Sequence, residues 1–247
     1  MPKFFVKQEQ VKNQEIEIIN EDVKHIKNVL RKQIDDEIEI CDNDTGKNYM
    51  CKIEEIQKEK IICKIIQKLE SISEPKVKVS IFQGLPKADK MELIIQKSVE
   101  LGVEKIIPTN LKRCIVKIDK KEEKKKLERW QKISEVAAKQ SGRDTIPQIK
   151  NIINIKELCE KVKEYDIILV AYEQEKENTL KQELQKIKNK PNAKIGVVIG
   201  PEGGIDAEEI EQLKQAGAKI ITLGQRILRT ETVALNVLSI IMYELED

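Results

Sequence analysis

The fold follows from one stretch of the sequence, IGVVIGPEGGID at residues 195–206. Its first five residues form an uninterrupted apolar run, which predicts a fully buried strand. The loop that follows contains Gly203 and Gly204, which lack a Cβ and let backbone N–H groups approach a ligand closely. Open α/β sheets bind ligands in such loops, at the carboxyl ends of their strands. The stretch therefore predicts an α/β domain with a ligand site at this loop, although a tight turn before a helix would explain the glycines equally well.

A second loop of the same kind is predicted at residues 224–232, GQRILRTET. It follows an apolar run at residues 219–223, which predicts another strand, and it precedes an apolar helix from about Glu231 to Leu245. Arg226 and Arg229 flank an apolar pair, so guanidinium groups border an apolar slot. A capped helix start with solvated arginines is the alternative. Neither loop has the glycine spacing of a P-loop or of a dinucleotide-binding turn.

Read together, the GPEGG loop and the stretch LGQRILRTETVALN at residues 223–236 resemble the SPOUT methyltransferases, in particular the bacterial 16S ribosomal RNA (uracil-N3)-methyltransferase family. The resemblance implies an N-terminal PUA-like β-barrel that binds RNA, followed by a SPOUT α/β domain with a C-terminal trefoil knot. It also implies S-adenosylmethionine as the cofactor, a homodimer, and 16S ribosomal RNA of the small ribosomal subunit as the substrate. Shorter matches to the family lie at residues 25–31, Gln83-Gly84, Lys90-Met91-Glu92, Gln96-Lys97, Arg113-Cys114, Val116-Lys117 and residues 137–143.

The sequence predicts two domains, residues 1–72 and residues 75–247. The stretch between them, residues 69–76, contains serines and a proline and is expected to be a linker. The first domain is expected to be a small barrel, because short alternating strands accompany a single amphipathic helix. In the second domain, strands alternate with helices, which indicates a mostly parallel sheet.

Within the two domains several elements are predicted by their residues. They are an amphipathic helix at about residues 22–30, a hairpin at residues 37–53, a capping box formed by Asp89 and Glu92, an extended segment at residues 113–118 and a long helix at residues 120–141. The last helix of the chain is apolar nearly all round. It is therefore expected to lie in the core or in a dimer interface, and the sequence does not choose between the two.

The composition fits a globular protein without a metal site. Of 247 residues, 40% are hydrophobic and 36% are charged, and the net charge is only +2, so a nucleic-acid partner requires a local basic patch. One histidine and five cysteines without a C-x-x-C pair predict no metal site and reduced thiols. No apolar run is long enough to span a membrane, and the N-terminus has no signal-peptide pattern. A cytoplasmic protein without a membrane partner is expected.

Three sets of site residues are predicted. Methylation at N3 of uracil requires the loss of a proton and the stabilisation of an anion, so Arg229 and Glu231 are predicted to be catalytic. Glu202 is the alternative proton acceptor, and Arg226 is the alternative group to stabilise the anion. The family resemblance implies cofactor contacts from Ala171, Tyr172, Glu173, Ile199, Gly200, Pro201, Glu202, Gly203, Gly204, Leu223, Gly224, Arg226, Ile227, Leu228, Arg229, Thr230, Thr232 and Ala234. Contacts with RNA phosphates are predicted for Lys3, Lys24, Lys27, Arg31, Lys90, Arg113 and Arg143, with an ordinary solvated surface as the alternative.

Other functions stay open at this point. A methyltransferase of the same fold can act on another RNA nucleotide, and a different enzyme can bind NAD or ATP at the same loops. An RNA-binding module without catalysis is a third reading. The intact Gly203, Gly204, Arg229 and Glu231 argue against it.

Overall fold

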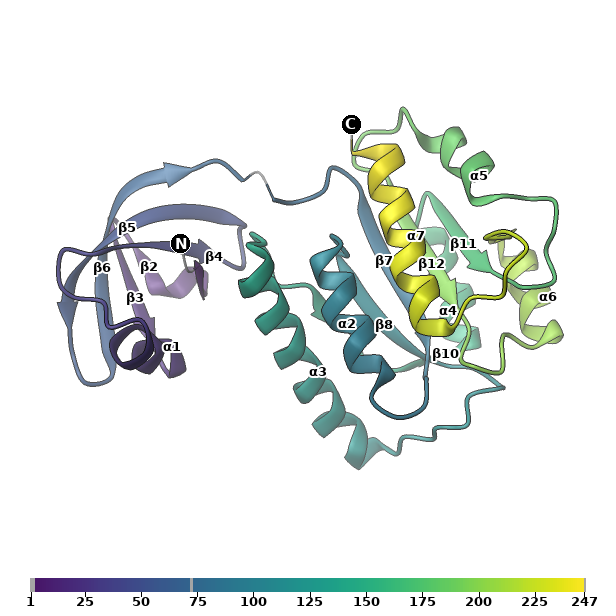
Figure 1. Cartoon of the computed structure of the whole chain (residues 1–247), viewed down its shortest axis with the longest axis horizontal. Coiled ribbons are helices and arrows are strands. Elements are labelled where there is room, and N and C mark those ends of the chain that lie inside the picture. Colours follow the sequence, from purple (N-terminus) through teal and green to yellow (C-terminus); the bar gives the residue numbers. More distant parts are fainter. Residues whose placement is uncertain (1–2, 72, 247) are drawn as a thin grey trace. The chain divides into compact units, whose positions relative to one another are not determined.

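The computed structural model describes residues 3–71 and 73–246. The chain divides into two compact units. The first contains the chain up to Glu74 together with Ala138–Ile146, and the second contains Pro75–Ala137 and the chain from Pro147 onward. The first unit is built on a mostly antiparallel sheet and the second on a parallel sheet with helices (Figure 1). A segment far along the chain, residues 138–146, thus belongs to the N-terminal unit.

The first unit contains a six-stranded sheet in the order β1-β4-β5-β6-β3-β2. β1 pairs with β4 in parallel, and the other neighbours are antiparallel. Alternate residues point into the core, so Ile16, Ile18, Ile38 and Ile40 are buried. The hairpin predicted at residues 37–53 is confirmed as β4 and β5. The strands are β1 (Lys3–Val6), β2 (Val11–Lys12), β3 (Glu15–Ile19), β4 (Glu37–Asp42), β5 (Lys47–Ile56) and β6 (Lys60–Leu69).

The helical segment of this unit ends earlier than the sequence predicts. α1 (Glu21–Lys24) runs directly into a π-helical turn, η2 (His25–Val29), and a short 3-10 turn, η1, covers Gln8–Gln10. Arg31 has a φ of 52°, in the left-handed region. The chain therefore leaves the helix at Arg31, so Arg31, predicted to contact RNA with Lys24 and Lys27, does not share a helical face with them.

The second unit contains a parallel sheet in the order β10-β8-β7-β12-β11-β13, with β9 paired to β8. Every pairing in it is parallel, as the alternation of strands and helices predicts. β12 lies near the middle, and residues 195–199 are all buried, which confirms the strand predicted from the apolar run. The strands are β7 (Lys78–Gly84), β8 (Lys105–Asn110), β9 (Gln148–Ile149), β10 (Ile153–Asn154), β11 (Ile167–Ala171), β12 (Lys194–Ile199) and β13 (Lys219–Ile221).

Helices pack on this sheet and on one another. α2 (Lys90–Glu100) packs against α7 (Thr230–Leu245), and α4 (Ile155–Lys161) packs against α6 (Ala207–Ala216) (Figure 1). The remaining helices are α3 (Lys120–Ser141), η3 (Val162–Glu164) and α5 (Leu180–Ile187). α7 buries one face within this chain, while Tyr243 on its other face is 79% exposed. No helix in the described part of the chain is long and apolar enough to cross a membrane.

Two local predictions are wrong, and two helices, α4 and α6, had not been predicted. Asp89 precedes α2, but its side chain makes no capping hydrogen bond, because its ψ of 9° is not the extended conformation that a capping side chain needs. Residues 113–118 form no strand, and the N–H of Cys114 instead closes a turn on the carbonyl of Leu111. α6 had not been predicted, although Asp206 and Glu209 form the capping box at its start.

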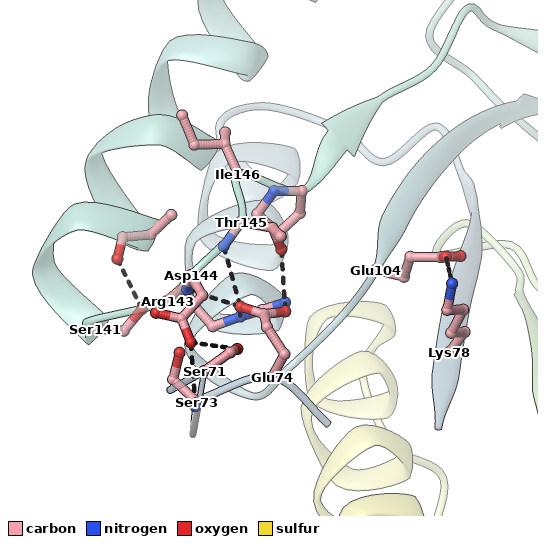
Figure 2. Close-up of polar contacts among 12 residues, drawn as sticks. Ser71, Ser73, Glu74, Lys78, Glu104, Ser141, Arg143, Asp144, Thr145 and Ile146 are labelled. Carbon is pink, nitrogen blue, oxygen red and sulfur yellow. Dashed lines mark hydrogen bonds and ion pairs between the residues drawn. The ribbon is translucent and has the colours of Figure 1, made fainter. Parts of the chain in front are cut away.

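Polar side chains hold the linker to the segment after α3 within the first unit (Figure 2). The carboxylate of Glu74 accepts hydrogen bonds from Arg143 and from the backbone N–H groups of Asp144 and Thr145. The carboxylate of Asp144 in turn accepts from Lys3 and, at 2.6 Å, from the hydroxyl of Ser71. Burial alone would raise the pKa of Asp144, but these donors lower it to about 2. We call these residues the linker clamp.

Candidate functional site

A cavity of about 530 Å³ opens at the carboxyl ends of β11, β12 and β13 in the second unit. This is the edge of a parallel sheet where α/β proteins bind ligands. The loops after the three strands meet there, although they are distant in the sequence. The cavity is lined by Lys90, residues 171–173, residues 199–205, residues 222–230 and Val233. Among the described residues, no group of three or more His, Cys, Asp or Glu side chains is placed to hold a metal ion.

The glycines of the first loop bring its backbone close to the cavity. Gly204 has a φ of 72°, and a Cβ there would lie 2.8 Å from Oε1 of Glu173. A Cβ on Gly200 would lie 2.9 Å from the carbonyl carbon of Gly204. Gly203 has no positive φ, and its Cβ would meet only Arg113, at 3.3 Å. The tight turn therefore depends on Gly204 and Gly200 more than on Gly203.

A buried hydrogen-bond chain joins this loop to the start of α7. The side chain of Gln83 donates to the hydroxyl of Thr230 at 2.9 Å, and that hydroxyl donates to the carbonyl of Gly200 at 2.7 Å. Gln83 is fully buried, and its Oε1 has no hydrogen-bond partner among the described residues. The chain fixes the first loop against the second through groups that water cannot reach.

Lys90 joins the same two loops through its charge. Its Nζ lies 3.1 Å from Oε1 of Glu202, in the GPEGG loop, and 3.3 Å from Oε2 of Glu231, in the first turn of α7. Burial alone would raise the pKa of Glu202, but hydrogen bonds from its own N–H and that of Lys87, with the Lys90 ammonium, hold it below its usual value. The sequence reading of Glu202 as a proton acceptor is therefore disfavoured, because a lowered pKa makes a weaker base.

Comparison with known proteins identifies the family. Residues 73–242 match the RNA methyltransferase domain family, and residues 18–66 match the RNA methyltransferase PUA domain family. The ribosomal RNA small subunit methyltransferase E of Bacillus subtilis strain 168 is 38% identical over 231 residues, which cover 93% of this chain and 90% of that protein. The chain belongs to the RNA methyltransferase family. The fold implied by the resemblance, a PUA-like domain followed by a SPOUT α/β domain, is thereby confirmed.

Two solved structures of such methyltransferases are similar over nearly the whole chain. The ribosomal RNA small subunit methyltransferase E of Neisseria gonorrhoeae, bound to S-adenosylmethionine, is 31% identical with a TM-score of 0.86, covering 98% of this chain and 97% of that one. A methyltransferase of Legionella pneumophila, also bound to S-adenosylmethionine, is 30% identical with a TM-score of 0.83, covering 98% and 96%. Both proteins hold the cofactor on a fold that this methyltransferase shares.

The second loop of this methyltransferase leaves its cations unpaired. Arg226 and Arg229 line the cavity, and neither makes an ion pair or a side-chain hydrogen bond within the part of the chain that the structure describes. Ile227 between them is 84% exposed. Of the predicted cofactor residues, only Thr232, which is exposed, and Ala234, which is buried in α7, lie outside the cavity lining. The cofactor contacts themselves stay predictions.

Some of the residues predicted to bind RNA are exposed, and the others make contacts within the chain. Lys24 and Arg31 are exposed, while Lys27 donates to the carbonyl of Gln57. Lys3 and Arg143 belong to the linker clamp, so neither meets an RNA phosphate without breaking an internal ion pair. Arg113 braces the GPEGG loop instead, donating to the carbonyl of Gly203 at 3.1 Å.

Some site residues had not been assigned to the cofactor cavity from the sequence. They are Lys90, Ile205, Thr222, Gln225 and Val233 in the lining, and Gln83 in the buried chain behind it. Gln83 and Lys90 lie in short matches to the family, which was the one available signal. Local sequence says nothing of their partners, because Glu202, Thr230 and Glu231 follow more than a hundred residues later.

Proposed function

We propose that this protein transfers the methyl group of S-adenosylmethionine to N3 of a uracil in 16S ribosomal RNA of the small ribosomal subunit. The observation that carries the proposal is the cavity at the carboxyl ends of β11, β12 and β13, on a fold shared with two methyltransferases solved with S-adenosylmethionine bound. When bound, the cofactor supplies an activated methyl group on a sulfonium. No metal ion is required for this chemistry.

The cofactor is proposed to lie between the two loops, with its adenine on backbone amides of the GPEGG loop and the second loop. Gly200 and Gly204 permit the close approach of backbone that such contacts need. The cavity volume, about 530 Å³, suits a ligand of nucleoside size. Residues 171–173, after β11, close a third side of the cavity.

The protein's own residues must manage one proton and one negative charge. The N3–H of uracil gives its proton to a base, N3 then attacks the methyl carbon, and the carbon–sulfur bond breaks to leave S-adenosylhomocysteine. Glu231 is the better base, because Glu202 alone also accepts from the backbone N–H of Lys87 and has a lowered pKa. Arg229, which has no partner within the described residues, is proposed to stabilise the developing uracil anion.

The remaining parts of the chain are proposed to serve substrate binding. Residues 1–72 are the RNA-binding domain, supported by the match at residues 18–66 and by the exposed Lys24 and Arg31. Residues 75–247 are the methyltransferase domain. The exposed side of α7, which carries Tyr243, is proposed to contribute to a homodimer in the cytoplasm. Since N3 lies on the Watson–Crick edge, the target uracil must be unpaired or extruded from its stem.

The test is methylation of small ribosomal subunits from a strain that lacks this protein. Purified protein and labelled S-adenosylmethionine should introduce one methyl group, and mass spectrometry of nuclease fragments should find 3-methyluridine at one position of 16S ribosomal RNA. Methyl groups on another base, or on the ribose, would contradict the N3 proposal. Isothermal titration with S-adenosylmethionine, NAD and ATP checks the cofactor, and tight binding of only NAD or ATP would overturn it.

A further inference from the structure

Lys90 is a cation at a helix end that favours anions. It is the first residue of α2, where the helix dipole is positive. The acidic residue in the same turn, Glu92, does not neutralise it, because Glu92 pairs with Arg129 at 2.7 Å. The partners of Lys90 are instead the carboxylates of Glu202 and Glu231, which come from other segments of the unit. The position of Lys90 is thus explained by these two carboxylates, which lie beside the start of the helix.

Three segments meet at this one ammonium group: α2, which carries it, the GPEGG loop and α7. Glu202 belongs to the GPEGG loop and Glu231 to α7, while the segment before α2 also reaches Glu202 through the N–H of Lys87, at 3.1 Å. Ala88, between Lys87 and Lys90, has a φ of 51°, a conformation that a residue with a Cβ adopts only when its surroundings hold it there. The ammonium of Lys90 thus joins α2 to the carboxylates of Glu202 and Glu231.

The two carboxylates depend on the cation between them. Both lie within 3.3 Å of the same nitrogen atom, and their side chains are only 26% and 17% exposed. Like charges so close together, with little water around them, repel each other strongly unless a cation separates them. Oε2 of Glu231 is buried and makes no hydrogen bond among the described residues, so the Lys90 ammonium is its only counter-charge there.

We propose that Lys90 is a positioning residue for methyl transfer: it fixes the Glu231 carboxylate at the start of α7 by bridging it to Glu202. The inference rests on the proposed function, in which Glu231 accepts the uracil proton. It replaces the sequence prediction that Lys90 contacts RNA, because its charge is directed at two internal carboxylates. The charged groups near Glu231 are Lys90 from α2, Glu202 from the loop after β12, and Arg229 just before α7.

The first test compares Lys90→Met with Lys90→Arg, and uses Lys97→Met as the matched control. Lys97 is on the same helix and also pairs with a glutamate, Glu100, but it lies outside the cavity lining. At saturating S-adenosylmethionine, Lys90→Met should slow single-turnover methylation of small ribosomal subunits by at least about tenfold, because the Glu231 carboxylate is no longer held in place. Cofactor affinity should stay within about threefold. Lys90→Arg keeps the charge and should recover most of the rate, and Lys97→Met should match the wild type.

A second variant separates repulsion from general damage to the fold. Adding Glu202→Gln to Lys90→Met removes the carboxylate that repels Glu231, so part of the lost rate should return. A merely structural role for Lys90 predicts the opposite, a further loss. An unchanged rate in Lys90→Met, or a fall in cofactor affinity as large as the fall in rate, would overturn the proposal. If Lys90→Met binds ribosomal RNA more weakly and with a smaller salt dependence, the proposal is also overturned, because Lys90 would then contact RNA phosphates.

A measurement without substrate keeps this proposal distinct from the proposed function. NMR titration of ¹³C-labelled glutamate carboxyl groups should find Glu202 ionising below its usual range in the wild type. Its pKa should rise in Lys90→Met and not in Lys97→Met. If that rise is seen but the wild type methylates no uracil, the reaction has been assigned wrongly while Lys90 still holds the carboxylates. If the pKa of Glu202 does not move, the bridge itself is refuted.

Discussion

Arg143 and Glu74 form a two-pronged ion pair, with Nε 2.9 Å from one carboxylate oxygen and Nη2 2.6 Å from the other (Figure 2). Arg143 is only 4% exposed, so its charge is almost wholly removed from water. The fork geometry lets one carboxylate satisfy two N–H donors at once. Glu74 also accepts from the hydroxyl of Thr145 at 3.0 Å. The pair therefore holds the linker against a segment that follows it by about seventy residues.

The first prediction concerns this pair. Glu74→Gln removes the carboxylate charge that faces the buried guanidinium of Arg143. Breaking a buried pair costs about 3–5 kcal/mol, and because the side chain of Glu74 is 25% exposed we expect about 2 kcal/mol. Urea denaturation followed by circular dichroism measures the change. The control is Glu164→Gln, which breaks the exposed Lys161–Glu164 pair and should cost less than about 1 kcal/mol. Equal effects of the two changes would show that the linker clamp adds no stability.

The second prediction concerns acid stability. Asp144 has a pKa lowered to about 2 from an ordinary 3.8. A lowered folded-state pKa contributes stability above the unfolded value, and that stability is lost as the pH falls from about 4 toward 2. The contribution is on the order of 2 kcal/mol, since the side chain is 2% exposed. Asp144→Asn should lower stability at neutral pH by this amount and flatten its dependence on pH in that window. If the variant keeps the wild-type dependence of stability on pH, other carboxyl groups cause the acid sensitivity.

The third prediction concerns the cofactor loop. Gly204→Ala forces a Cβ into a left-handed residue, 2.8 Å from the carboxylate of Glu173. We expect affinity for S-adenosylmethionine to fall by at least about tenfold, or roughly 1.4 kcal/mol. Gly203→Ala is the matched control, because Gly203 has no positive φ and its Cβ would lie 3.3 Å from the Cβ of Arg113, which needs to move by only a few tenths of an ångström. Isothermal titration measures both affinities. Equal affinities for the two variants would mean that the cofactor does not bind at this loop.

The sequence predicted the parts of the fold that depend on local pattern. The apolar run at residues 195–199 identified β12, and amphipathic spacing ending at Gly142 identified α3. Asp89 was misread because a capping residue depends on its backbone conformation as well as its type. α6 was not predicted, although Asp206 and Glu209 form a capping box at its start. The trefoil knot stays a prediction from the resemblance.

Only part of the site could be predicted from the sequence. Both loops carry their own signals, glycines in one and flanking arginines in the other, so the lining was largely predictable. The groups behind the lining were not. Lys90 was assigned to RNA because an isolated lysine has no visible partner in a linear sequence, and its two carboxylates come from loops that meet it only in the folded sheet. Lys3 was assigned to RNA from the family resemblance and belongs to the linker clamp.

The last prediction separates catalysis from the fold. Arg229→Lys keeps a positive charge in the cavity lining but removes the planar fork. Arg229 is exposed and has no internal partner within the described residues, so stability and cofactor affinity should stay near normal. We expect the single-turnover rate on small ribosomal subunits to fall roughly 100-fold, the effect of losing one oriented donor to a developing anion. Arg226→Lys, in the same loop, is the control and should have a smaller effect.

Glu231→Gln then tests the proton route. If Glu231 is the base, the rate should fall by at least about 100-fold, and the acidic limb of the pH profile should disappear, because no carboxylate is left to titrate in that role. If Glu231 only favours the start of α7, the change should cost about 0.3–1 kcal/mol of stability and leave the rate unchanged, since its sole effect is then on the helix dipole. Full rates in both Arg229→Lys and Glu231→Gln would place the proton transfer and the anion stabilisation on other groups, and Lys90 would then hold Glu231 for stability alone.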